Sequence, residues 1–473
     1  MWKLGVPLAL LLGLPWTASA APDPSTLNIK GMPDSGRILN ELEPERRITP
    51  QQAKPEIDTK IPAVQQDSKE LAARIDRIGD LHIDNTSALL DSRLLAYVKG
   101  IRPGQLIESQ HLEKTLLALN DIPGLKVTAS MQPGKRRGSA DLMLKVFDLE
   151  REGNYLSYDN YGSKSTGRSR FGIEFHYNNL TNVGDQISLS GMTSTDDLHN
   201  VQLRYSVPVG SDGASLHLTA GQMNYVLGGQ YDYLNADGLT NTYELGIAIP
   251  VRRTYAQSLF YSVNVRHRDI HDYILSGTYG TEKASDSIEG DLYGYCRDGR
   301  NSFSWTVGHV AGDLSLRRNN YSAPDAVGNY HKSLADLYYI YDIDRDWQLH
   351  LSMSGQYGWT PLDSSEQFYI SGADAVRAFV QGEAGGRSGL LGTVELRRIL
   401  GRSGLTATAF VDAGRIMGDG TKDLAGTGLG LIYQKSRDWY GKFDWATPLG
   451  CHYSESLGKD ITSTAWLRLV KQF

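Results

Sequence analysis

The chain has 473 residues, with 50 glycines, 26 tyrosines, 22% charged residues, a formal net charge of −6 and a mean hydropathy of −0.36. This near-neutral balance, without a basic excess, argues against a nucleic-acid-binding protein. The two cysteines, Cys296 and Cys451, are too few for a disulfide framework and match no zinc spacing, although an extracytoplasmic location would allow them to pair.

The first 20 residues have the features of a secretory signal peptide. Lys3 precedes an apolar run over residues 4–16, and the small residues 18–20 form a processing site. An uncleaved anchor is the alternative interpretation, but the apolar run is short for a spanning helix. After residue 20 no window offers the about 20 apolar residues of a membrane helix, so any later span must be a closed β-barrel.

Residues 21–45 and 46–70 are rich in proline, glutamine and charge, a composition that favours a linker without a core. Within the first stretch, residues 33–42 combine a capping sequence with apolar residues on one side. This pattern fits a short helix that ends before Pro44. A disordered linker throughout is an equally good interpretation of the same pattern, and residues 46–70 are expected to be linker in either case.

Residues 71–150 have the pattern of a small folded domain. Alternation predicts a strand over residues 73–83, and apolar spacing predicts helices over 89–98 and 109–122. Two strands are predicted next, over 125–131 and 140–147, with a proline–glycine turn between them. This β-α-α-β-β order predicts an α+β domain in which the helices cover one face of a sheet.

From residue 151 to residue 473, period-two alternation replaces helical spacing. In the segment 347–359 the tryptophans, leucines, methionine and tyrosine fall on one face, and the polar residues on the other. The segments 171–177, 243–249 and 405–411 repeat this pattern. Strands of about ten residues with one apolar and one polar face are typical of transmembrane barrels.

At about 20 residues per strand and connection, this stretch holds about 16 antiparallel strands. The fold class predicted is therefore an all-β transmembrane barrel preceded by a small α+β domain. Residues 465–473 are expected to form a barrel strand that ends on the aromatic Phe473. A soluble β-sandwich would also alternate, but it would need a second apolar layer over more than three hundred residues.

Two segments depart from the alternation: residues 368–380, followed by a glycine-rich stretch over 382–389, and residues 408–415. Because Val411 continues the lipid-facing row, Asp412 is expected to point into the lumen, where a loop carrying Arg377 would meet it. A guanidinium and a carboxylate can form a bidentate pair that fixes such a loop. From spacing alone, an exposed arginine and a solvated aspartate are the simpler interpretation.

These segments resemble the signature motifs of the polypeptide-transporting outer-membrane barrels. Within that superfamily, the chain is most similar to the haemolysin- and haemagglutinin-secreting transporters of two-partner secretion. Residues 112–124 resemble their membrane-proximal POTRA domain, residues 159–167 resemble the first hairpin of their barrel, and residues 33–42 resemble their plug helix.

The resemblance implies roles for particular residues. It implies a lumenal loop motif that meets an inner-wall motif, and a POTRA surface that docks the substrate. The loop motif comprises Gly372, Val376, Arg377 and Phe379, the inner-wall partners are Asp412 and Gly414, and the docking residues are Leu112, Leu116, Leu119 and Val127.

The sequence departs from the family pattern in two places. Ala378 stands where the loop motif of the family usually has glycine, which puts a tight backbone turn at that point in doubt. The family usually carries two POTRA domains, whereas residues 71–150 have room for one. How the substrate is first captured is therefore open.

The resemblance implies energy-independent export of a large secreted partner, such as an adhesin or a haemolysin, from the periplasm to the cell surface. The expected partners are that polypeptide, outer-membrane lipid and, during biogenesis, the barrel-assembly machinery, with no nucleic acid and a monomeric state. We expect no enzymatic activity, no cofactor and no metal. His267 and His271 share a strand face without a third ligand nearby, and the sequence has no nucleotide motif.

Two other functions remain to be weighed. A passive solute porin or a receptor would share the barrel but would not need a POTRA-like domain. A barrel-assembly factor would be expected to carry more POTRA domains than one. In all three cases the protein is expected in the outer membrane, with the N-terminal domain in the periplasm.

Overall fold

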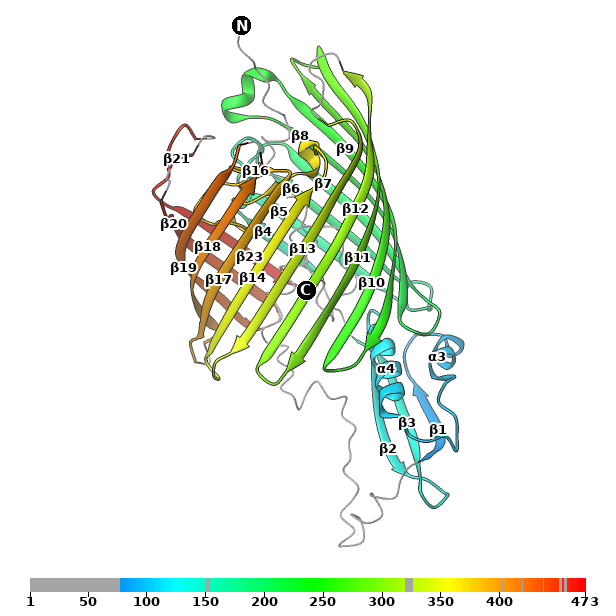
Figure 1. Ribbon diagram of the computed structural model, residues 1–473. Helices are drawn as coiled ribbons and strands as arrows, with labels where there is room; N and C mark the ends of the chain where they lie inside the picture. The colour runs from blue at the N-terminus through cyan, green and yellow to red at the C-terminus, as the bar shows by residue number, and fades with distance from the viewer. Residues whose placement is uncertain are drawn as a thin grey trace.

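The structure is a computed structural model that describes residues 77–149, 154–319, 326–401, 403–418, 420–436, 438–450, 453–454 and 457–473. It comprises a small α+β domain and a closed barrel (Figure 1). The expected signal peptide, plug helix and linker lie outside the described residues. No helix in the described ranges is both long and apolar enough to cross a membrane.

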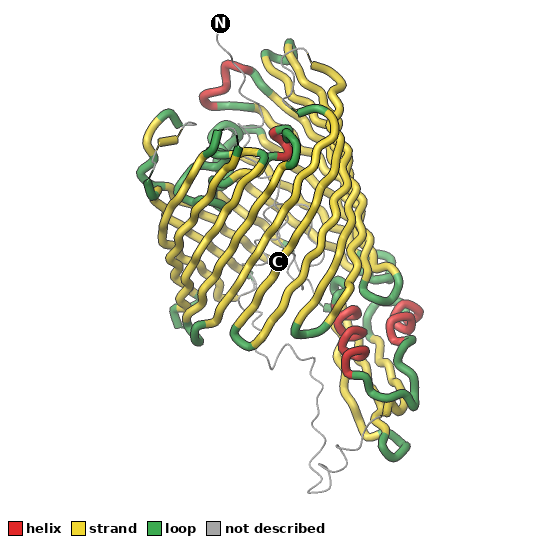
Figure 2. The backbone as a smooth tube through the Cα atoms, in the orientation of Figure 1, coloured by secondary structure: helices red, strands yellow, loops and turns green. Residues whose placement is uncertain are grey.

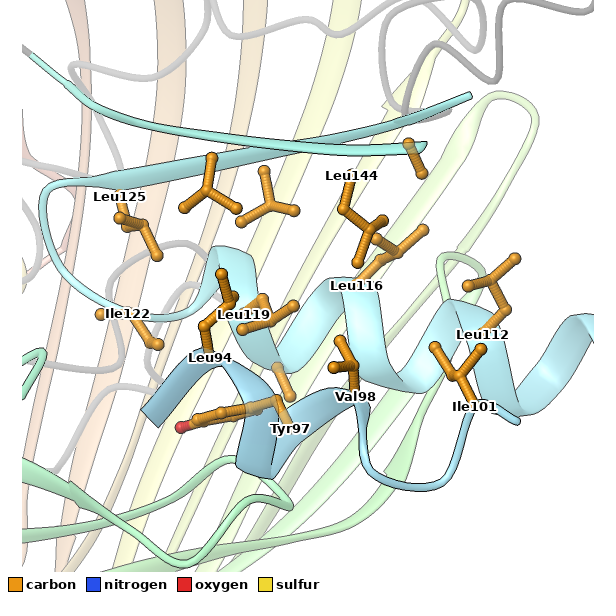
Figure 3. Close-up of a cluster of buried hydrophobic side chains, with 14 of the residues drawn as sticks. Leu94, Tyr97, Val98, Ile101, Leu112, Leu116, Leu119, Ile122, Leu125 and Leu144 are labelled. Carbon is orange, nitrogen blue, oxygen red and sulfur yellow. The ribbon is translucent and has the colours of Figure 1, made fainter. Parts of the chain in front are cut away.

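The N-terminal domain has the element order predicted from the sequence. Its elements are β1 (Arg77–Asn85), α3 (Asp91–Val98), α4 (Ser109–Asn120), β2 (Leu125–Pro133) and β3 (Ser139–Asp148). The sheet has the order β1-β3-β2, with β1 parallel and β2 antiparallel to β3. Both helices pack on one face of this sheet (Figure 3).

The apolar side chains of α4 and β2 form the core of this domain and not its surface. The residues expected to dock a substrate are at most 9% exposed: Leu112, Leu116, Leu119 and Val127. Figure 3 shows the three leucines between the helices and the sheet. The prediction that these four side chains contact a substrate is therefore wrong, because the apolar face of an amphipathic helix is the face that packs on its own sheet.

The barrel has sixteen antiparallel strands in the described part of the chain, as predicted. Each strand pairs with its neighbours along the chain, and β23 pairs with β4 to close the ring. In ring order from the first strand, they are β4 (Tyr155–Asp159), β5 (Arg170–Asn178), β6 (Gln186–Ser194), β7 (Leu198–Val209), β8 (Ala214–Val226), β9 (Asp237–Arg253), β10 (Gln257–Ile274), β11 (Tyr279–Asp298), β12 (Asn301–Asn319), β13 (Gly328–Asp342), β14 (Trp347–Gly358), β17 (Ser388–Ile399), β18 (Leu405–Met417), β19 (Lys422–Ser436), β20 (Trp439–Pro448) and β23 (Thr464–Gln472).

The barrel wall has an apolar outer face and a polar inner face. In β5, Phe171, Ile173 and Phe175 are about half exposed and face outward, whereas Glu174 is buried. The glycines at 426, 428 and 430 lie inside β19, so this segment is a strand and not a phosphate loop. Alternation along each strand thus produces the two environments that a lipid-embedded barrel with a polar interior requires.

Short elements lie at the end of the barrel that faces away from the N-terminal domain (Figure 2). They are η3 (Gly229–Leu234), η4 (Ser364–Glu366), β15 (Phe368–Tyr369), β16 (Gly385–Gly386), β21 (Tyr453–Ser454) and β22 (Lys459–Asp460). Because β4 leads away from the N-terminal domain, the β14–β17 connection, residues 359–387, emerges at this far end. It is the loop that carries Arg377.

The N-terminal domain is tied to the turns at the near end of the barrel. Asp121, just after α4, forms a bidentate ion pair with Arg253 at the end of β9. Nε of Arg253 lies 3.0 Å from Oδ2 of Asp121. Arg93 of α3 donates to the carbonyl oxygen of Pro208 at 2.7 Å, and Lys114 lies 3.3 Å from Asp212. Burial raises the pKa of the Asp121 carboxyl, and the Arg253 guanidinium opposes that rise. These contacts place the domain directly below the β7–β8 and β9–β10 turns.

Cys296 lies near the end of β11, where it is exposed and has no disulfide partner among the described residues. Cys451 lies outside the described residues. The pairing of Cys296 with Cys451 therefore stays a prediction from the sequence.

Candidate functional site

The β14–β17 loop folds back into the barrel and packs on the inner wall of β17 to β20. Val376, Ala378 and Phe379 at its tip are fully buried, and they pack with Phe410 and Ala446 of the wall. Between the two ends of the loop and its tip, β15 pairs with β16 in a two-residue ladder. The loop is therefore a lumenal element seated on the barrel wall.

Arg377 is 4% exposed, and its guanidinium meets Asp412 of β18, which is fully buried. Nε and one terminal nitrogen of Arg377 donate to the two oxygens of the Asp412 carboxylate, both at 2.9 Å. The backbone N–H of Arg377 also donates to Asp412 at 3.1 Å. The bidentate geometry expected from the sequence is present, and Asp412 points into the lumen as its phase in the strand predicts.

Two further carboxylates share the same guanidinium. The other terminal nitrogen of Arg377 lies 2.8 Å from Glu395 of β17 and 3.3 Å from Asp444 of β20. Both acids are buried, and each has a second cation close by: Arg397 lies 2.7 Å from Glu395, and Lys442 lies 3.6 Å from Asp444. These contacts make the Arg377 cluster, in which the three cations Arg377, Arg397 and Lys442 balance the three anions Asp412, Glu395 and Asp444.

The carbonyl of Arg377 is held as firmly as its side chain. Trp466 of β23 donates its indole N–H to this oxygen at 2.7 Å, and the Thr464 hydroxyl donates to it as well. The guanidinium also stacks over the ring of Phe410. Strands β17, β18, β20 and β23 therefore converge on a single loop residue.

The glycines of the two motifs provide close approach between loop and wall. A Cβ built on Gly414 would lie 2.9 Å from the Cβ of Ile370, so glycine lets the loop rest against β18. Gly372 has φ of 123°, a conformation that favours glycine. The structure thus brings together all six residues of the predicted loop and inner-wall motifs.

Ala378 fits at the position where glycine was expected because the facing residue of the barrel wall has no side chain. Ala378 has no positive φ, and its Cβ lies against Gly426 of β19. A side chain at Gly426 would collide with it. The doubt raised by Ala378 is therefore resolved by a glycine on the facing strand.

Gly426→Ala is expected to unseat the loop tip. Overpacking of this kind costs about 1–3 kcal/mol, and the free energy is lost from the seated loop because Cβ of the new alanine meets Cβ of Ala378. The measurement is the temperature at which the purified barrel loses its folded mobility in a detergent gel, together with its conductance in a planar bilayer. Restoring space with Ala378→Gly in the same chain should bring both back.

The matched control for this prediction is Gly392→Ala in β17. A Cβ at Gly392 meets only a backbone oxygen at 3.8 Å, an ordinary contact. Wild-type behaviour of Gly426→Ala, or an equal effect of Gly392→Ala, would show that the close approach at Ala378 does not matter.

The expected first hairpin of the barrel lies beside the same site. β4 ends at Asp159, which accepts from Arg170 of β5 at 2.7 Å and from Arg468 of β23 at 3.0 Å. Tyr161 follows and packs edge-on against Trp466, with ring centroids 5.8 Å apart. The seam of the barrel, where β23 meets β4, is thus tied by buried ion pairs next to the strand that holds Arg377.

The participation of Glu395 and Asp444 was not predicted from the sequence. Both lie in the lumenal phase of their strands, between the lipid-facing residues of β17 and β20. The signal in the sequence that could have indicated them was an acidic residue at a lumen-facing position. It is a weak one, since many lumenal positions in other strands are also charged.

Among the described residues, one group has three metal-binding side chains close together, namely Asp80, His82 and Asp141 in the N-terminal domain. Asp80 already pairs with Lys135 at 3.2 Å, and its backbone N–H donates to Asp141 at 2.7 Å. His82 is exposed, the two aspartates are partly buried and already have partners within the protein, and the group belongs to a different domain from the loop.

Comparisons with known proteins agree with this architecture. The family model of the haemolysin secretion/activation protein ShlB/FhaC/HecB matches residues 138–433. The heme/hemopexin transporter protein HuxB of Haemophilus influenzae is 26% identical over 425 residues, which cover 84% of this chain and 73% of HuxB.

Solved structures share the fold. CdiB from Escherichia coli superposes with a TM-score of 0.69 at 20% identity, covering 84% of this chain and 76% of that one. BamA from Haemophilus ducreyi lacking POTRA domains 1–3 gives a TM-score of 0.57 at 14% identity, with 84% and 85% covered. Because the family model spans more than half of the chain, this protein belongs to the haemolysin secretion/activation family ShlB/FhaC/HecB, whose members are outer-membrane transporters of two-partner secretion.

Proposed function

We propose that this protein exports one large partner polypeptide from the periplasm to the cell surface, with the N-terminal domain as its receptor and the barrel lumen as its path. The observation that carries the proposal is the loop anchored through Arg377 inside a sixteen-stranded barrel of this family. A solute pore has no use for a docking domain below its lumen. The family match also favours export over general barrel assembly.

The partner would dock on the exposed edge of β2 and not on the buried leucines. The side-chain amide of Asn120 bonds both backbone groups of Val127, the N–H at 2.9 Å and the carbonyl at 3.1 Å, and so closes the edge there. By the two-residue period of a strand, the backbone groups of Ala129 and Met131 point the same way. An extended client strand can pair with them whatever its sequence.

Side-chain selectivity would come from the groove beside this sheet. Ile78, Leu106, His111 and Met131 line it, and Leu106 is about half exposed. A client strand with apolar residues on alternate positions would place them in this groove. This assignment replaces the four buried residues as the proposed docking surface.

Transport would involve no covalent chemistry and no cofactor. The inner wall offers polar side chains to a passing chain, and folding of the partner outside the cell would give the process its direction. Lipid contacts the apolar outer face of the barrel, the barrel-assembly machinery inserts it, and one copy forms one complete ring.

The test is deletion of the gene in its own host, followed by comparison of surface, medium and periplasmic proteins. We expect one large secreted protein, encoded beside this gene, to disappear from the surface and to collect in the periplasm. A general loss of outer-membrane barrels would identify an assembly factor instead. Unchanged secretion with altered uptake of small solutes would identify a porin.

A further inference from the structure

The stem of the lumenal loop carries two buried acidic side chains that do not belong to the Arg377 cluster. Asp363 precedes η4 and is 8% exposed, and Glu366 ends η4 and is 5% exposed. Both lie before β15, on the segment that descends from β14. Their partners lie on a different part of the barrel wall from those of Arg377.

Glu366 is held by both its side chain and its backbone. Its carboxylate pairs with Arg268 of β10, and with Lys332 of β13 at 2.8 Å. Its carbonyl oxygen accepts from Lys332 at 3.2 Å and from the Gln356 amide of β14 at 2.9 Å. The Tyr330 hydroxyl donates to the same carboxylate at 3.2 Å. Three strands therefore fix this one residue.

Asp363 is held by Lys283 of β11, whose ammonium lies 3.1 and 3.0 Å from the two carboxylate oxygens. The same carboxylate accepts the backbone N–H of Ser365 at 3.1 Å and so caps η4. The cap orders the turn that presents Glu366. The two acids thus act as one unit, which we name the stem anchor: Asp363 and Glu366 with Lys283, Arg268 and Lys332.

The stem anchor and the Arg377 cluster use different strands of the barrel wall. The first uses β10, β11, β13 and β14, and the second uses β17, β18, β20 and β23. These strands belong to one continuous arc that runs from β10 to β23 in the ring. The loop is therefore fastened at two independent places along this arc.

The tip between the two ends of the loop is bordered by glycines in positive-φ conformations. Gly372 has φ of 123° and Gly382 has φ of 78°. Residues 373–381, which include Arg377, lie between them. Glycine changes its backbone angles with little steric penalty, so these two positions are suited to act as pivots.

We propose that Asp363 and Glu366 are positioning residues that keep the stem fixed when Arg377 leaves its carboxylates, so that the tip swings about Gly372 and Gly382 while the stem stays on the wall. The release of the tip during export rests on the proposed function. The stem anchor itself does not depend on a client, and it can be tested in the purified protein.

The experiment places nitroxide spin labels on the loop of the full-length protein in lipid vesicles. Cys296 and Cys451 are first replaced by serine, and a single cysteine is then introduced as Gln367→Cys in the stem or Ala375→Cys in the tip. Both positions are half-buried. The electron paramagnetic resonance line shape reports the mobility of each label, without any client present.

We expect both labels to be immobile in the otherwise unaltered protein. Arg377→Ala should mobilise the tip label and leave the stem label immobile. Adding Asp363→Asn and Glu366→Gln to Arg377→Ala should mobilise both labels. A mobile stem label in Arg377→Ala alone, or an immobile stem label in the triple variant, would overturn the proposal.

Two further variants keep the result interpretable. Returning Glu366 to the triple variant, which leaves Arg377→Ala with Asp363→Asn, should immobilise the stem label again, because Glu366 keeps its pairs with Arg268 and Lys332. A stem label that stays mobile in this chain would contradict the role of Glu366. Asp423→Asn breaks an exposed carboxylate–guanidinium pair with Arg415 at the same end of the barrel. That control should leave both labels unchanged, and an equal effect would contradict a specific anchor.

Discussion

Arg377→Ala is expected to reduce export of the partner about tenfold or more, while the barrel still inserts and closes. The substitution leaves Asp412, Glu395 and Asp444 facing one another without the guanidinium that joins them. Breaking a buried ionic cluster in this way costs about 3–5 kcal/mol. The loop tip would detach from the wall and become mobile in the lumen through which the partner passes. The measurement is the amount of partner at the cell surface relative to the amount of barrel.

Arg377→Lys separates charge from geometry. A lysine supplies one positive charge but cannot reach Asp412 with two parallel bonds and the other carboxylates at the same time. We therefore expect export between those of the wild type and the alanine variant. Full export with alanine, when the barrel is present in equal amount, would remove the proposed role of this residue.

Removal of the N-terminal domain, residues 77–148, is expected to abolish export altogether. The barrel should remain in the outer membrane, because its sixteen strands close on themselves without the domain. The partner would then lack the sheet edge on which it is captured. Partner protein in the periplasm and at the surface is measured, with folded mobility of the barrel in a detergent gel as the control.

Met131→Pro tests the edge of β2 without removing the domain. Proline is tolerated on an edge strand. At position 131 it removes the N–H that points away from β3, together with the methionine side chain that lines the groove. We expect a marked loss of export with an intact domain, whereas Leu119→Ala should act differently, by destabilising the domain core by about 2–5 kcal/mol. Normal export by Met131→Pro would place capture elsewhere.

The sequence was sufficient for the barrel because alternation is a local property. In β14, Gln348 and His350 turn inward between Trp347, Leu349 and Leu351, as the pattern requires. The same phase placed Asp412 on the inner wall. Closure also follows from the sequence, since an open sheet cannot remain in lipid with unpaired edges.

Contacts between distant segments were beyond the reach of the pattern. Glu395 and Asp444 meet at Arg377 only because the loop descends onto β17 and β20, a geometry that no spacing encodes. Asp363 and Glu366 are ordinary loop acids in sequence, and their buried cations lie on strands far along the chain. The role of Gly426 opposite Ala378 likewise depends on register between the loop and β19.

The docking prediction was wrong for a related reason. An apolar stripe on a short helix indicates the side that will be buried, and in a small domain that side faces its own sheet. Leu116 and Leu119 are therefore core residues. The docking edge of β2 depends on which backbone groups Asn120 has already bonded, and sequence spacing does not reveal that.

Site-specific photo-cross-linking of a partner arrested during export shows whether the partner passes through the barrel lumen. The cross-linking residue is placed at Gln202 on the inner face of β7 or at its neighbour Leu203 on the outer face. A partner fused to a tightly folded domain stalls in transit. We expect cross-links to the partner from Gln202 and none from Leu203. Absence of cross-links from Gln202 and from other inner-face positions, while export continues, would contradict passage through the lumen.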